Sequence, residues 1–157
     1  MVISETLAGM LNAQISHELA NRLQYLMIAS WCHGQGLKGL ESFFTTQASG
    51  EQEHADKFTA YLNEANAQVA VPAVEKRTSE FKDCEQIANL YVETEALTTE
   101  KIMALWRQTE TDRDIGSQDL LQVMLREQIE EEGLAERFGN LVDLAGGDLL
   151  KLDLMFS

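Results

Sequence analysis

Residues 49–58 read SGEQEHADKF and place a carboxylate, Glu51, and an imidazole, His54, three positions apart. In a helix this spacing puts the two side chains on one face, one turn from each other. The same face carries a stripe of apolar residues and is therefore predicted to be buried: Phe44, Ala48, Ala55, Phe58 and Leu62. A carboxylate costs several kcal/mol to bury alone, so Glu51 needs a partner. A carboxylate together with an imidazole suits iron, manganese or zinc better than calcium.

The elements that position these groups are predicted to be four long helices. Helical periodicity covers about residues 4–32, 37–66 and 83–111, and a fourth segment from just after Ser117 to 145. Short glycine-containing links make the first and last pairs antiparallel neighbours. Residues 67–82 reach about 53 Å when extended, enough to run the length of a helix. The sequence therefore predicts an all-α, ferritin-like four-helix bundle with one long crossover between helices 2 and 3.

An acidic residue interrupts the apolar stripe of each predicted helix near its middle. These residues, one per helix, are Glu18, Glu51, Glu95 and Glu131. In an antiparallel bundle the mid-helix positions sit at one level, so four carboxylates would converge in an apolar core. Their mutual repulsion calls for several positive charges among them. A pair of divalent cations meets this need, with Glu51 bridging them and His54 adding a nitrogen ligand. Iron is the choice that also offers redox chemistry.

The composition of the chain limits the kinds of molecule that it is expected to bind. The chain has 157 residues, 12 basic and 26 acidic side chains and a formal charge of −14. Such a surface repels nucleic acid and anionic membranes and attracts cations. The two cysteines have no CxxC spacing, the start MVISETLAGM is not expected to act as a secretory signal, and no apolar run is long enough for a membrane span. We expect one domain, residues 1–157, in the cytoplasm.

Four stretches make nearly the whole chain resemble the bacterial non-haem ferritins: NAQISHELANRLQY, SGEQEHADKF, ETEALTTEKI and LREQIEEEG. The resemblance implies a di-iron site inside the bundle. One iron would be held by Glu18, Glu51 and His54. The second would be held by Glu51, Glu95 and Glu131.

The resemblance also implies roles for two further side chains. Gln128, which with Glu131 takes the place of a second Glu-x-x-His, would hydrogen-bond near the bound oxygen species. Tyr25, two turns after Glu18, matches a tyrosine that supplies an electron beside such centres. The methionine by which bacterioferritins bind haem would fall at Gln52, so no haem is expected.

Three departures from the family pattern lead to further expectations. Glu127 and Glu130 match two ligands of a third iron site, but the third ligand position is Gly50, so that site should be weakened or absent. Glu127 and Glu130 also fit a solvated acidic face equally well. A tryptophan of some relatives is Val123, which leaves Tyr25 as the electron donor. A short tail, DLLKLDLMFS, stands in place of a full fifth helix, and its apolar residues should dock, on this subunit or another. The shortened end leaves two alternatives, a wider four-fold channel than is usual in the family or a different assembly.

The implied function is that of an iron-storage ferritin with ferroxidase activity. Such a protein oxidises Fe(II) with O2 or hydrogen peroxide, binds two irons per subunit at the ferroxidase site and deposits a mineral core in a homo-oligomeric cage of 24 subunits. An alternative is a di-iron oxidase or peroxide-detoxifying protein of the same superfamily without substantial storage. A bundle with a degraded, purely structural site is disfavoured by the complete ligand set. His17 and His33 are expected at the surface or an interface rather than among the ligands.

Overall fold

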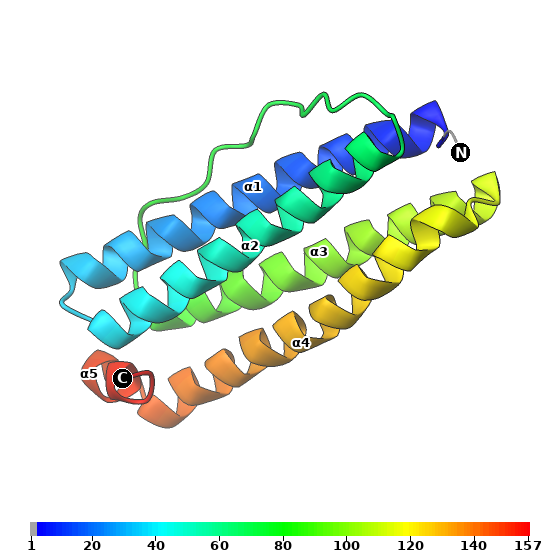
Figure 1. Ribbon diagram of the computed structural model, residues 1–157. Helices are drawn as coiled ribbons and strands as arrows, with labels where there is room; N and C mark the ends of the chain where they lie inside the picture. The colour runs from blue at the N-terminus through cyan, green and yellow to red at the C-terminus, as the bar shows by residue number, and fades with distance from the viewer. Residues whose placement is uncertain (1–2) are drawn as a thin grey trace.

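The computed structural model describes residues 3–157, and in that part of the chain it contains four long helices and one short one (Figure 1). Their bounds are α1 (Glu5–Gly34), α2 (Lys38–Glu64), α3 (Cys84–Asp112), α4 (Ile115–Ala145) and α5 (Leu149–Leu154). The chain turns tightly between α1 and α2 and again between α3 and α4. The expected four-helix bundle with a short final helix is confirmed.

Side-chain caps define where three of the long helices begin. Ser4, Asp83 and Asp114 each accept a hydrogen bond from the backbone N–H three residues further on. Such caps satisfy one of the free N–H groups at a helix start. Because Asp114 caps α4, this helix begins at Ile115, slightly before the position just after Ser117 that periodicity indicated.

The crossover between α2 and α3 runs beside α1 along most of its length (Figure 1). Three polar side chains of α1 hold it there. Asn12 donates to the carbonyl of Gln68 at 2.9 Å, and Ser16 and Gln24 donate to carbonyls at residues 73 and 78. The crossover returns the chain along the bundle, so α2 and α3 start at the same end. The length of residues 67–82 predicted this return along the bundle.

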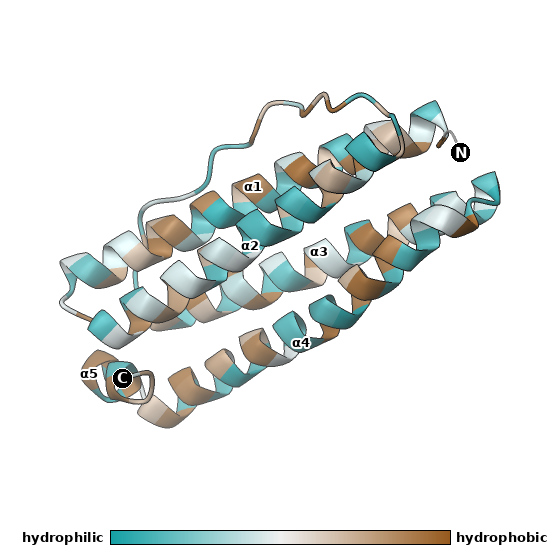
Figure 2. Ribbon diagram, in the orientation of Figure 1, coloured by the Kyte–Doolittle hydropathy of each residue, from teal (hydrophilic) through white to brown (hydrophobic). Residues whose placement is uncertain are grey.

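The apolar core is divided into two clusters, one toward each end of the bundle. Tyr25, Phe44, Tyr91 and Phe138 belong to one cluster, and Leu7, Leu11, Phe58, Leu62 and Leu105 belong to the other. Hydrophobic and hydrophilic residues alternate around the long helices (Figure 2). On each long helix the predicted acidic residue lies between residues of the first cluster and residues of the second. The bundle therefore has a polar layer between two apolar halves.

On the fourth helix, alternate spacings of three and four residues predict a buried stripe that includes Leu121, Leu125 and Gln128. In the structure Leu125 is only half-buried, whereas Met124 beside it is 1% exposed and joins the core. Glu131 is half-buried rather than fully enclosed. The stripes predicted on the other three helices are buried throughout.

The C-terminal tail docks on its own chain, at the start of α2. Leu37 precedes α2 and makes no side-chain cap, and Asp153 of α5 instead accepts a hydrogen bond from the Leu40 N–H at 2.8 Å. Leu152 is fully buried and Phe156 packs against Phe43. Docking is therefore confirmed for this side of the tail. On the other side, residues 150 and 154 are 66% and 64% exposed on this chain, so docking of that side on another subunit stays a prediction.

Two glycines of α2 differ in the space around them. A Cβ on Gly39 would lie 2.5 Å from the Asp153 carbonyl oxygen, whereas a Cβ on Gly50 would meet nothing within 4 Å. Gly39 is thus required by the docked tail. Packing within the chain gives no reason for glycine at position 50.

We expect opposite effects from alanine at these two positions. Gly39→Ala should destabilise the protein by about 1–3 kcal/mol because the tail must shift. Gly50→Ala should stabilise it by about 1 kcal/mol because alanine favours the helix. Thermal unfolding of the two variants beside the parent protein measures both effects, and a lower midpoint for Gly50→Ala would show that Gly50 has a contact role.

Candidate metal centre

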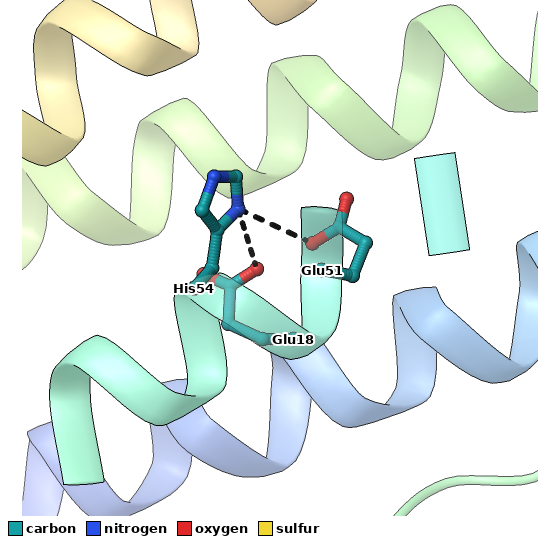
Figure 3. A group of neighbouring side chains, drawn as sticks. All are labelled: Glu18, Glu51 and His54. Carbon is teal, nitrogen blue, oxygen red and sulfur yellow. Dashed lines mark ion pairs between the residues drawn. The ribbon is translucent and has the colours of Figure 1, made fainter. Parts of the chain in front are cut away.

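Glu18, Glu51 and His54 form a cluster whose ligand atoms all lie within 4.8 Å of one another. His54 Nδ1 faces Glu51 Oε2 at 3.6 Å and Glu18 Oε2 at 3.9 Å (Figure 3). Helix α1 supplies Glu18, and α2 supplies the other two residues from one face. The structure thus brings together three side chains that the sequence assigned to one iron.

A neighbouring amide orients the carboxylate that comes from α1. Gln14 lies one turn before Glu18 and donates from Nε2 to Glu18 Oε1 at 2.6 Å. Glu18 Oε2 is left facing His54. Because Glu18 is completely buried, this amide holds its carboxylate in one orientation. The contact between Gln14 and Glu18 follows from their spacing of four residues on a helix.

The other two acids come from α3 and α4 and have different surroundings. Glu95 accepts hydrogen bonds from the Tyr25 hydroxyl and from Gln128 Nε2, the latter at 2.7 Å. Gln128 also reaches the Glu95 backbone carbonyl at 3.1 Å. Both carboxylate oxygens of Glu95 therefore have a donor. These contacts place the tyrosine and the glutamine beside the site, as expected.

Buried oxygens without a hydrogen-bond partner gather at this level of the bundle. Within residues 3–157 such atoms include Oε2 of Glu18, Glu51 and Glu131. An unpartnered buried carboxylate oxygen is costly. Oxygen ligands beside one imidazole nitrogen form a donor set that suits a divalent transition metal. The residues present therefore fit a metal centre in the bundle core.

The electrostatics of the site agree with this reading. Burial, followed by the charge of Glu51, raises the pKa of Glu18 well above its ordinary value. Burial raises the pKa of Glu51 to about 8, and burial with the charge of Glu95 raises that of Glu131 to about 7. Burial also raises the pKa of Glu95, although its bonds from Tyr25 and Gln128 oppose the shift. Without a cation, the site holds protons that a metal ion would displace.

The two remaining histidines lie in different environments. His33 is exposed, as expected. His17 was expected at the surface or an interface, and the surface alternative is wrong: His17 is 8% exposed within its own chain, and its Nε2 lies 2.8 Å from the Thr98 hydroxyl. Burial, followed by the charges of Lys101 and Arg77, lowers the pKa of His17 to about 4. The crossover and α3 lie on this side of α1. The periodicity of α1 alone does not predict which elements pack against it.

The two acids assigned to a weakened third site are placed differently. Glu127 lies between α4 and α2, where both of its carboxylate oxygens accept hydrogen bonds from Lys57 Nζ. Glu130 is exposed. Sequence reasoning missed Lys57, although its position one turn after His54 on the same face was a signal.

Comparisons with known proteins point to one family. Residues 8–144 match the family model of the ferritin-like domain. A probable bacterial non-heme ferritin-like protein of Haemophilus influenzae is 31% identical over 147 residues, covering 94% of this chain and 89% of that protein. A bacterial non-heme ferritin of Campylobacter jejuni is 31% identical over 145 residues, covering 92% and 87%. An open pore ferritin of Archaeoglobus fulgidus superposes with a TM-score of 0.94 at 32% identity, covering 99% of this chain and 96% of that chain.

None of the helices in residues 3–157 combines the length and the hydropathy that crossing a bilayer requires.

The raised carboxyl pKa values predict how the stability of the metal-free protein depends on pH. An unfolded glutamate titrates near 4.5, whereas folded Glu131 and Glu51 titrate near 7 and 8. Between these values the folded state binds more protons, so stability should fall as pH rises from about 5 to 8. The loss should be on the order of a few kcal/mol.

Chemical denaturation of chelator-treated protein at several pH values measures this dependence. Glu51→Gln should remove much of it, because the amide stays neutral. Zn(II) added at pH 8 should restore stability by binding the folded state. A metal-free protein equally stable at both ends of this range would contradict the argument.

Proposed function

Because this chain belongs to the ferritin-like family, we propose that it is an iron-storage ferritin with ferroxidase activity. It oxidises Fe(II) with O2 or hydrogen peroxide inside the bundle and deposits Fe(III) as a mineral core. The observation that carries the proposal is the cluster of Glu18, Glu51 and His54 in the core, with buried carboxylate oxygens that lack a partner within the described residues 3–157.

Each residue of the site has a proposed role toward the iron substrate. Glu18, Glu51 and His54 hold one Fe(II), and Glu51 is shared with a second that Glu95 and Glu131 hold. Carboxylates favour the harder Fe(III) and so assist oxidation. Two Fe(II) lose one electron each, and O2 takes both with two protons to give hydrogen peroxide. Ligand carboxyl groups with raised pKa values give up protons as iron binds.

Tyr25 and Gln128 support this chemistry from the other side of the site. Tyr25 is fully buried and bonds to Glu95, which suits it to supply an electron to the centre. Gln128 orients Glu95 and offers an amide near the position of the oxygen species. No haem is assigned, because Gln52 stands at the position of the haem-binding methionine.

Charge and family membership support the proposed assembly. The formal charge of −14 per chain draws cations toward the protein. We assign the whole of residues 1–157 to one ferritin-like domain that forms a homo-oligomeric cage, taken as a 24-mer, in the cytoplasm. The alternative is a di-iron oxidase or peroxide-detoxifying protein that uses the same ligands without storing iron.

Stopped-flow oxidation of Fe(II) by the aerobic apo-protein tests the proposal. We expect a fast phase that saturates near two irons per chain, then slower growth of a soluble core in a large assembly measured by sedimentation. Glu51→Ala should abolish the fast phase because both irons lose a ligand, whereas Glu136→Ala, an exposed change on α4, should keep it. Fast oxidation without a core would support the oxidase alternative, and no protein-dependent oxidation would refute both.

The role of the tyrosine makes a separate prediction. Tyr25→Phe should keep the amount of bound metal but slow the fast phase several-fold, because the phenol is lost while the ring still packs on Phe44 and Tyr91. Anaerobic Fe(II) titration gives the binding, and stopped-flow absorbance gives the rate. A variant as fast as the parent protein would remove Tyr25 from the electron-transfer step.

A further inference from the structure

A lysine and a glutamate join α2 to α4 at the edge of the metal centre. Lys57 Nζ lies 2.6 Å from Glu127 Oε1 and 2.7 Å from Glu127 Oε2. The ammonium group therefore sits between both oxygens of one carboxylate, in the position that a chelated cation would take. The side chains are 38% and 33% exposed, and ion pairs this accessible to water stabilise a fold little. Stability alone does not explain the arrangement.

The same carboxylate faces the imidazole of the metal centre. Glu127 Oε2 lies 3.3 Å from His54 Nε2, while His54 Nδ1 faces Glu18 and Glu51 (Figure 3). The side chain of His54 is 8% exposed, and its ring lies between Glu18 and Glu51 on one side and Glu127 on the other. The two ring nitrogens of His54 therefore face different acids. Nδ1 is directed into the centre, and Nε2 is directed at Glu127.

This geometry has a chemical consequence for the ligand. A neutral imidazole that binds metal through Nδ1 carries its proton on Nε2, where a carboxylate can accept it. Such a partner fixes both the tautomer and the ring orientation. A carboxylate that was itself bound to a metal ion would serve less well. The ammonium group of Lys57, which is bonded to the Glu127 carboxylate, keeps metal ions away from it. The carboxylate can then face His54 Nε2.

We propose that Glu127 is the positioning residue of His54 and that Lys57 keeps it in this role by occupying the place of a further cation. Glu127 directs His54 Nδ1 toward Glu18 and Glu51. Lys57 makes the centre selective for a pair of ions rather than three. The inference rests on the proposed function and assigns a task to two residues outside the ligand set of the di-iron site.

Two substitutions of Glu127 test its positioning role, with Zn(II) as a redox-inert probe in calorimetric titrations of the full-length assembly. Glu127→Leu should weaken binding about 10- to 100-fold. Glu127→Gln should recover part of the loss, since its amide oxygen still accepts a hydrogen bond from the Nε2–H group of His54. The control Glu136→Leu makes the same change at an exposed site of α4. If Glu127→Leu binds Zn(II) as tightly as this control, Glu127 does not position His54.

The substitution Lys57→Met tests the second half of the proposal. Without the ammonium group, Glu127 should bind a cation, and the Zn(II) stoichiometry should rise by one per chain. Lys38→Met, at an exposed site of the same helix, should leave the stoichiometry unchanged. An unchanged stoichiometry in Lys57→Met would overturn the assignment of Lys57.

Failure of this inference and failure of the proposed function give different results. If the unmodified protein binds no Zn(II) and oxidises no Fe(II), the metal centre itself is refuted. If it does both and the Glu127 and Lys57 variants match their controls, only the positioning role is refuted. Glu127→Gln keeps the size of the side chain, so it gives a result even if Glu127→Leu does not fold.

Discussion

The cost of burying carboxylates at one level of a helical bundle is the constraint on which this structure depends. Glu18 and Glu95 are almost completely inaccessible, and Glu51 is 4% exposed. Their pKa values rise mainly because water is excluded. The charge of Glu51 adds to the rise at Glu18, and the charge of Glu95 adds to the rise at Glu51. A core of this kind is unfavourable without bound positive charge. The buried acids of the binding site therefore lower the stability of the metal-free fold.

The rest of the bundle compensates for this polar layer. Apolar clusters on either side provide the burial that stabilises the helices. Within the layer, amides and a hydroxyl satisfy selected oxygens: Gln14 bonds to Glu18, and Gln128 and Tyr25 bond to Glu95. Oε2 of Glu18, Glu51 and Glu131 is buried without a hydrogen-bond partner among residues 3–157. Acids that are oriented by neighbours and keep an unpartnered buried oxygen are suited to bind a cation.

The two halves of the site differ in how closely their side chains are gathered and in whether their carboxylates already have hydrogen-bond donors. The half formed by α1 and α2 gathers Glu18, Glu51 and His54 around one point. In the half formed by α3 and α4, Glu95 is engaged with Tyr25 and Gln128, and Glu131 is half-buried. Most of this arrangement was predictable, because each of the four acids interrupts the apolar stripe of a periodic helix. The engagement of Glu95 by two donors was not, since those donors come from other helices.

The sequence by itself determined the helices, the long crossover and the acid in each core stripe, because these follow from local periodicity and from the reach of an extended chain. Only the tertiary structure decided which polar groups meet across helices. His17 is buried and meets Thr98 of α3, Asp153 caps a helix more than a hundred residues earlier, and Lys57 reaches Glu127 from another helix. These contacts depend on the rotation and height of packed helices. Periodicity specifies a face of a helix but not the atom opposite it.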